Sequence, residues 1–444
     1  MIIKKSDQLT IGKVFLFWAP LALMWLIMGI ELPAVNAIIS RLPLPKENLA
    51  AFGVTFAIAL IIEGPIIQLL TAGTALSNHL ENYKRLLTFM HIMAGVLTGI
   101  HLLIGATPLY GFVTRTVLGI PEHLIGPSRE SFLLMLPWSA AIGYRRLWQG
   151  VLIRYGRTGA VPIIMILRIA VTGLILGTGL STGFLSGASV GGLSLSAGVT
   201  AGAVSAYFFC RSLLRKKVIK PAGPDEKTIS WKGLLTFYVP LALTSFILLA
   251  VRPIITAGIA RAPQSLDSLA LWPVIHSFLF LFTSVALSYQ EVVVALLEGD
   301  DRYRVLQRFT WMISFALMAV FFLVPVLNLD TVWFRTVVGV PADLMPLVRA
   351  PMYILPFMPF LLTQTTWYRG IQVKRRVTMN ITKGVLVNGV VLTVLLFSAA
   401  ELLPVSGVVI AAGALTAAHL LEMLFLRMKT ERQNRIRPEA RSCG

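Results

Sequence analysis

The sequence predicts an all-α polytopic membrane protein, with twelve transmembrane helices in two parallel repeats of six. Its 444 residues are 56% hydrophobic and only 13% charged, which is far more apolar than soluble globular proteins are. Apolar runs of about 20 or more residues recur from end to end, and each is long enough to cross a hydrocarbon layer of about 30 Å as a helix. The runs are too continuous for transmembrane β-strands, which are about 10 residues long and alternate polar with apolar residues.

The twelve expected spans begin with an apolar run that follows a short basic N-terminal segment. This run lacks a small-residue cleavage site, so it is interpreted as a retained helix rather than a signal peptide. The tenth span contains Pro351, Pro356 and Pro359 and is therefore predicted to be irregular. In order, the spans lie at 14–38, 49–77, 86–106, 131–153, 158–180, 186–210, 233–258, 268–297, 305–327, 346–371, 377–400 and 403–427.

The two halves of the chain repeat each other at an interval of 220 residues. This shift places FWAPLALMWLIMGIELPAVNAIISR (17–41) on FYVPLALTSFILLAVRPIITAGIAR (237–261), and RTVLGIP (115–121) on RTVVGVP (335–341), without a gap. Six spans in each half mean that both halves enter the membrane in the same direction, as repeats related by an axis along the membrane normal do. Substrate sites in such proteins usually lie near the bilayer midplane, between the repeats.

The expected organisation is two lobes joined by a cytoplasmic linker. The N-terminal lobe is 1–210, a charged linker that contains Pro and Gly is 211–232, the C-terminal lobe is 233–428, and a basic cytoplasmic tail is 429–444.

The net charge of +19 is explained by membrane topology rather than by a nucleic-acid partner. Most of the 39 Lys and Arg residues fall in the tails and the even-numbered loops, which is the positive-inside pattern. Both termini are therefore expected in the cytoplasm, in a cell (inner) membrane, with anionic lipids as partners of the basic loops. Arg168 and Arg252 are singled out as basic residues within spans.

Glu31 lies inside the apolar first span, within GIELPAVNAIISR (29–41). A carboxylate at the bilayer centre costs about 2–3 kcal/mol on insertion scales, so it should face water or a partner. Loss of hydration favours the neutral form of a carboxyl group, which makes proton uptake and release possible. Pro33 should bend the helix, as should the matching Pro253 of the seventh span, and thereby free a carbonyl for an ion or water. Glu31 is therefore a candidate ion-coupling residue.

Glu63 is the second candidate, in ALIIEGPIIQLL (59–70) near the middle of the second span. It lies too deep for interfacial solvation, so it is predicted to bind a proton or cation, with Gln68 as a polar companion. His276 of the eighth span and Asn36 of the first are candidate substrate-binding residues. The alternative for both is a hydrogen bond that packs one helix against another.

Two arginines within spans complete the set of candidates. Arg252 suits an anionic substrate because its guanidinium makes bidentate contacts with carboxylate or phosphate. It matches Leu32 in the 220-residue register, so it could instead pair with Glu31 and hold two helices together, or snorkel to the outer interface. Arg168, in the middle of the fifth span, needs an acidic partner that the sequence does not identify.

Enzymatic interpretations find little support. GASVG (187–191) matches the pattern of a nucleophilic serine, but that motif requires a preceding strand, and here it begins an apolar helix. Zinc-protease, phosphate-loop and Cys/His metal motifs are lacking. We therefore expect no catalytic residue, metal site or cofactor, apart from a coupling H⁺ or Na⁺.

This organisation, with a charged first helix repeated as the seventh, resembles the multidrug/oligosaccharidyl-lipid/polysaccharide (MOP) exporter superfamily. That group includes the multidrug and toxic compound extrusion (MATE) transporters and lipid-linked oligosaccharide flippases. The resemblance implies alternating access by two lobes and makes Glu31 the match of the acidic coupling residue of the first helix, although MATE transporters usually have Asp there. RPIITAGIAR (252–261) looks most like the progressive ankylosis family, which implies pyrophosphate, ATP or citrate as cargo.

The sequence thus predicts a monomeric secondary active transporter that exports a small organic or anionic solute, coupled to protons or sodium. The alternatives are a flippase for lipid-linked saccharides and a membrane scaffold or regulator without cargo.

Overall fold

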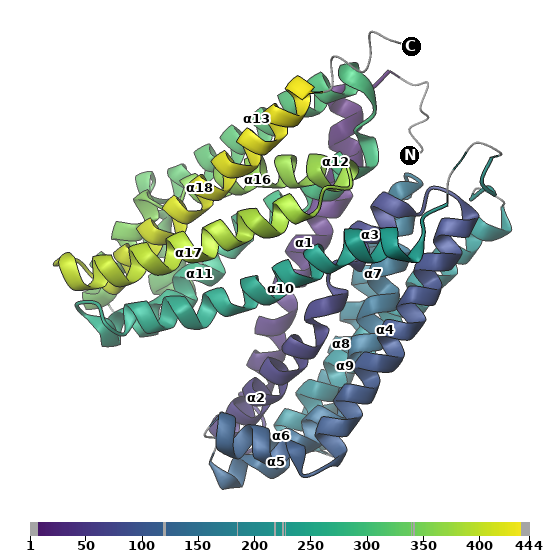
Figure 1. The fold of residues 1–444 in the computed structure, drawn as a ribbon. Coiled ribbons are helices and arrows are strands. Elements are labelled where there is room, and N and C mark those ends of the chain that lie inside the picture. Colours follow the sequence, from purple (N-terminus) through teal and green to yellow (C-terminus); the bar gives the residue numbers. More distant parts are fainter. Residues whose placement is uncertain are drawn as a thin grey trace. The chain divides into compact units, whose positions relative to one another are not determined.

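The helices of the first half of the chain recur in the same order in the second half, 220 residues later (Figure 1). The computed structural model describes residues 8–436 apart from 119–120, 184, 217–218, 224–225, 227, 339 and 341. The first half contains α1 (Ile11–Ile39), α2 (Pro45–Glu63), η1 (Gly64–Ile66), α3 (Leu69–Leu76), α4 (Leu80–Ala106), α5 (Leu109–Phe112), η2 (Val113–Val117), α6 (Glu122–Leu134), α7 (Trp138–Arg154), α8 (Ala160–Thr182) and α9 (Gly187–Arg215).

The second half largely repeats this order, and its α10 and α12 begin and end 220 positions after α1 and α3. It differs where α11 is continuous in place of α2 and η1, and where η4, α15 and η5 replace α6. Its elements are α10 (Trp231–Ile259), α11 (Ser265–Leu287), α12 (Tyr289–Leu296), α13 (Gly299–Val326), α14 (Leu329–Thr331), η3 (Val332–Val338), η4 (Ala342–Leu344), α15 (Met345–Arg349), η5 (Ala350–Tyr353), α16 (Phe357–Lys374), α17 (Met379–Leu402) and α18 (Gly407–Ile436).

The repeat extends to individual turn conformations. Leu44 and Gln264, which precede α2 and α11, both have positive φ angles, of 53° and 52°. Gly156 and Arg376, which follow α7 and α16, have φ angles of 70° and 60°. Left-handed backbone is uncommon outside glycine, so its recurrence at the same register means that the two halves share a backbone design and not only a hydrophobic pattern.

The described residues divide into two units, one within 26–238 and the other within 8–25 and 239–436. The boundaries fall inside α1 and α10, so each of these helices has residues in both units. In the first unit α9 packs against α7 and α8, and α7 packs against α3 and α4. In the second unit α18 packs against α16 and α17, which are the repeat's counterparts.

Eleven helices of the described residues are long and apolar enough to cross a membrane, and the chain is a multi-pass integral membrane protein. The expected span at 131–153 is missing from these eleven. Helix α6 ends at Leu134, and α7 starts only at Trp138 and has 17 residues. Pro137 just before α7 lacks a backbone N–H and disfavours helical geometry in the residue ahead of it, which explains the interruption.

The predicted irregularity of the tenth span is confirmed, because α15 and two short 3₁₀ segments, η4 and η5, precede α16. Helix α1 continues through Pro33. Pro253 lies in α10, but its side chain is outside the described part of the chain. The bends at these prolines therefore stay predictions. Of the expected basic tail, residues 437–444 are outside the described residues.

Glycine allows α3 and α7 to approach very closely. A Cβ atom at Gly150 would lie 2.3 Å from the carbonyl oxygen of Leu70, and one at Gly73 would lie 2.8 Å from that of Leu147. Backbone atoms cannot move aside as a flexible side chain can. In the second half only one of the two glycines recurs. Gly370 corresponds to Gly150, and a Cβ there would lie 2.6 Å from the Cβ of Val293, which corresponds to Gly73.

Replacing Gly150 with alanine is expected to destabilise the protein by at least about 1–3 kcal/mol, because overpacking forces helices apart. Thermal unfolding of the purified protein in detergent measures the effect. The matched control is Gly173→Ala in α8, where a Cβ meets nothing within 4 Å and the gain in helix propensity is up to about 1 kcal/mol. Equal unfolding midpoints for the two variants would show that α3 and α7 do not pack this closely.

Candidate functional site

Glu31 is buried in the first unit and is bound by an arginine of α8. Arg168 Nε donates a hydrogen bond to Glu31 Oε1 at 2.9 Å, and Arg168 Nη2 donates to the second carboxylate oxygen. Both side chains are only 5% exposed. Thr172, one turn further along α8, donates from Oγ1 to Glu31 Oε1 at 3.2 Å. Glu31 is thus held by a bidentate ion pair and a third hydrogen bond, an arrangement suited to a full negative charge.

Small residues on α9 make room for this part of α8. A Cβ at Gly198 would lie 2.0 Å from Thr172 Oγ1 and 3.0 Å from the carbonyl oxygen of Arg168. A Cβ at Gly202 would lie 3.5 Å from the Cβ of Arg168. The stripe of small residues in α9 therefore fixes the position from which α8 presents Arg168 to α1, in keeping with the role of small residues between membrane helices.

Glu63 forms the second acidic position of the same unit. It ends α2, is 6% exposed, and accepts a hydrogen bond of 3.1 Å from Trp138 Nε1 in α7. The Arg168 guanidinium carbon lies over the Trp138 ring, 5.9 Å from the ring centroid. Arg146, Arg145 and Arg168 are close enough for their charges to act on the Glu63 carboxylate. Trp138 therefore connects the two acidic positions in one buried cluster.

Arg145 of α7 completes this cluster. It is 2% exposed, and its Nη1 contacts two neutral acceptors, Gln149 Oε1 at 3.2 Å and Met165 Sδ at 3.5 Å. Its Nε donates to no acceptor among the described residues. We define the N-lobe cluster by its charged members, which are two carboxylates and three guanidiniums: Glu31, Glu63, Arg145, Arg146 and Arg168.

The second unit contains a smaller cluster at related positions. Arg369 Nε donates to Glu422 Oε1 at 3.0 Å, and Asn388 Nδ2 donates to Glu422 Oε2 at 3.0 Å. In the 220-residue register Arg369, Asn388 and Glu422 correspond to Gln149, Arg168 and Gly202. Both halves thus place polar side chains at the same junction of three helices, but with different charges.

The remaining predicted site residues are dispersed over the two units. In the first unit, Asn36 is exposed on α1, and Gln68 is half-buried just before α3. In the second unit, Arg252 is exposed on α10, and the half-buried His276 of α11 lies with its ring 6.0 Å from that of Trp272. The structure brings Glu31 and Glu63 into one cluster, whereas Arg252 and His276 belong to the other unit.

Sequence reasoning missed several members of the N-lobe cluster. Arg145 and Arg146, which are both buried, were not singled out from the sequence. The sequence did not identify the acidic partner of Arg168, and the structure shows that this partner is Glu31. The sequence had suggested Arg252 as a possible partner of Glu31. The available signal was the polarity of Arg145, Arg146 and Gln149, three polar residues within five positions of an otherwise apolar run.

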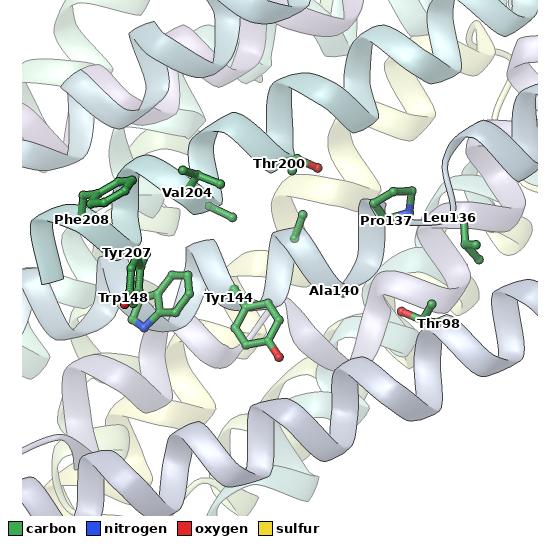
Figure 2. Close-up of a pocket in the computed structure, with 12 residues that line it drawn as sticks. Thr98, Leu136, Pro137, Ala140, Tyr144, Trp148, Thr200, Val204, Tyr207 and Phe208 are labelled. Carbon is green, nitrogen blue, oxygen red and sulfur yellow. The ribbon is translucent and has the colours of Figure 1, made fainter. Parts of the chain in front are cut away.

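A separate apolar groove opens between α4, α7 and α9, with a volume of about 650 Å³. Figure 2 shows Tyr144 and Trp148 of α7 beside Tyr207 and Phe208 of α9, with Thr98 of α4 further along. The rings of Trp148 and Tyr207 lie 5.2 Å apart. None of the predicted site residues lines this groove, and its chemistry suits an apolar guest rather than an ion.

Helix α7 separates the groove from the N-lobe cluster. Tyr144 and Trp148, one turn apart, line the groove, whereas Arg145 and Gln149, shifted by one residue, contact each other in the buried cluster. Successive residues of a helix point about 100° apart, which accounts for the two faces.

The fold is similar to solved structures of membrane transporters, at low sequence identity. A mutant of the Vibrio cholerae MATE transporter VcmN matches with a TM-score of 0.78 and 15% identity, over 95% of this chain and 97% of that one. An outward-facing multidrug resistance MATE family transporter of the MOP superfamily gives 0.67 and 13%, over 96% and 98%. A Pyrococcus furiosus MOP superfamily transporter, described with a binding pocket of reverse polarity that suggests a different function, gives 0.63 and 15%, over 95% and 96%.

No protein-family model and no curated protein matches the sequence itself. The similarity therefore concerns the arrangement of the helices and extends over nearly the whole chain. The chain has the fold of the MATE transporters of the MOP superfamily.

Proposed function

We propose that this protein is a secondary active transporter that exports a small organic or anionic solute by alternating access, coupled to protons or sodium. The observation that carries the proposal is the buried pair of Glu31 and Arg168, with Thr172 as a further donor, in a transporter fold. In the proposed topology, the protein spans a cell (inner) membrane and both termini lie in the cytoplasm. The proposed working form is a monomer.

The chemistry of the pair supports coupling. A proton on Glu31 removes the charge that balances Arg168, and a sodium ion would compete with Arg168 for the same oxygens. Either event changes the net charge of a buried site by one unit, and such a change is costly unless the surroundings rearrange. An ion that binds one lobe conformation better than the other shifts the equilibrium between them by that difference in affinity.

The proposed cargo is a small organic or anionic solute. Arg252 is exposed and can make bidentate contacts with an acid group, and Asn36, Gln68 and His276 are candidate polar contacts. The resemblance to the progressive ankylosis family favours small anions such as pyrophosphate or citrate. One neighbour in the MOP superfamily is described with a binding pocket of reverse polarity that suggests a different function, which is in keeping with a cargo unlike that of the multidrug transporters.

Transport by the purified protein in proteoliposomes tests this function. We expect a pH or sodium gradient to drive accumulation of a radiolabelled organic anion, and a protonophore or sodium ionophore to abolish the accumulation. Movement of a labelled lipid-linked saccharide without solute flux would favour the flippase alternative. Absence of every flux, with the protein folded, would contradict transport and favour a scaffold.

A further inference from the structure

Arg145 is a buried cation with unused hydrogen-bonding capacity. A guanidinium has five N–H donors, yet the contacts of Arg145 are one amide oxygen and one thioether sulfur, and its Nε has no acceptor among the described residues. Sulfur is a weak acceptor, and a buried charge without a counterion is strongly destabilising. No carboxylate among the described residues therefore accepts a hydrogen bond from Arg145.

The charges around Arg145 do not supply that group. Glu31 is held on both oxygens by Arg168, and Glu63 accepts from Trp138 while also lying in the field of Arg146. The N-lobe cluster has three guanidiniums and two carboxylates, so one positive charge remains when all five groups are ionised. One monovalent anion would neutralise it.

In the second half of the chain, the corresponding junction of three helices contains an ion pair. There the buried guanidinium of Arg369 in α16 meets the carboxylate of Glu422 in α18. The residue that corresponds to Glu422 in α9 is Gly202, and a Cβ at Gly202 would lie 3.0 Å from Arg145 Cδ. In the first half, Arg145 thus lies beside the position that a carboxylate occupies in the second half. Gly202 leaves this position without a side chain.

We propose that Arg145 binds a small anion at the junction of α7, α8 and α9, in the place of the carboxylate that Glu422 supplies in the other half. The ligand is a halide or the acid group of a small organic anion. It accepts from Arg145 Nε and displaces Met165, whose thioether side chain is flexible enough to yield. The site concerns binding alone, so it does not depend on the proposed transport.

The first test is thermal unfolding of the full-length protein in detergent. Chloride or acetate is titrated, with ionic strength held constant by the sodium salt of a bulky sulfonate. A ligand that binds only the folded state raises the unfolding midpoint with its concentration, so we expect a rise of several degrees. A rise with chloride alone identifies an inorganic ion, and a rise with acetate identifies the acid group of an organic anion. A midpoint independent of both anions would overturn the proposal.

Two sets of variants assign the effect to Arg145. Arg145→Gln should abolish the dependence on anions, and Arg145→Lys should retain part of it. Gly202→Glu should reproduce the arrangement of the second half and make the midpoint independent of anions, whereas Gly202→Gln, of the same size, should not. Retention of the full dependence in Arg145→Gln would contradict the assignment. If these variants do not fold, equilibrium dialysis of the wild-type protein with labelled chloride or acetate decides, because the proposal requires one bound anion per chain.

Discussion

Replacing Arg168 with glutamine is expected to lower the free energy of unfolding by about 3–5 kcal/mol, the usual cost of removing one partner of a buried ion pair. The variant leaves Glu31, which is 5% exposed, with Thr172 as its remaining described donor. Thermal or denaturant unfolding in detergent measures the change. The matched control is Arg427→Gln, which breaks the half-exposed pair with Glu431 and should cost less than about 1 kcal/mol.

The double variant Glu31→Gln/Arg168→Gln separates a mutual interaction from two independent losses. Two neutral amides can hydrogen-bond to each other and leave no buried charge, so the double variant should be more stable than Arg168→Gln alone. Coupled residues in contact depart from additivity by about 0.5–3 kcal/mol. Strictly additive losses would mean that Glu31 and Arg168 do not form a pair in the folded protein.

The repeat was predictable because the two halves of the sequence align at a single offset of 220 residues without a gap. Identical prolines and arginines recur 220 residues apart, and the structure places α10 and α12 at the same interval from α1 and α3. The acidic positions were also predictable, because a carboxylate inside an apolar membrane span has a high free-energy cost and usually has a functional role. Hydropathy alone thus located both Glu31 and Glu63.

The partners of these carboxylates were not predictable from one sequence. Glu31 and Arg168 are 137 residues apart, and which two membrane helices lie side by side depends on tertiary packing. The repeat even suggested a different partner, Arg252, because it lies at the position that matches Leu32. The close approach of α8 and α9 depends on Gly198 and Gly202, whose importance becomes visible only when the facing side chains are known.

Arg145 and Arg146 were not singled out from the sequence, for a different reason. The positive-inside rule assigns arginines near the end of a span to the cytoplasmic interface, and this rule describes most basic residues of the chain well. It does not separate an arginine that faces lipid headgroups from one that faces the interior of the bundle. The structure makes that distinction, because Arg145 is 2% and Arg146 7% exposed.

Gradient-driven transport by Glu31→Gln is expected to fall to the level of protein-free vesicles. Glutamine has nearly the size of glutamate and still accepts a hydrogen bond from Arg168, but it cannot exchange a proton or attract sodium. The variant therefore resembles the protonated state permanently. Flux in proteoliposomes under a pH or sodium gradient measures the loss, and the unfolding midpoint of the same preparation checks that the protein is folded.

Glu63→Gln is the control variant that shows whether the loss of transport is specific to Glu31. Glu63 receives a hydrogen bond from the neutral Trp138 Nε1 rather than a bidentate ion pair, so its neutralisation leaves the pair of Glu31 and Arg168 intact. If Glu31 alone couples the ion, Glu63→Gln retains gradient-driven flux, and if both carboxylates take part, each variant loses it. Undiminished flux in both variants would make the pair of Glu31 and Arg168 a structural tie between α1 and α8, and coupling would have to reside elsewhere in the chain.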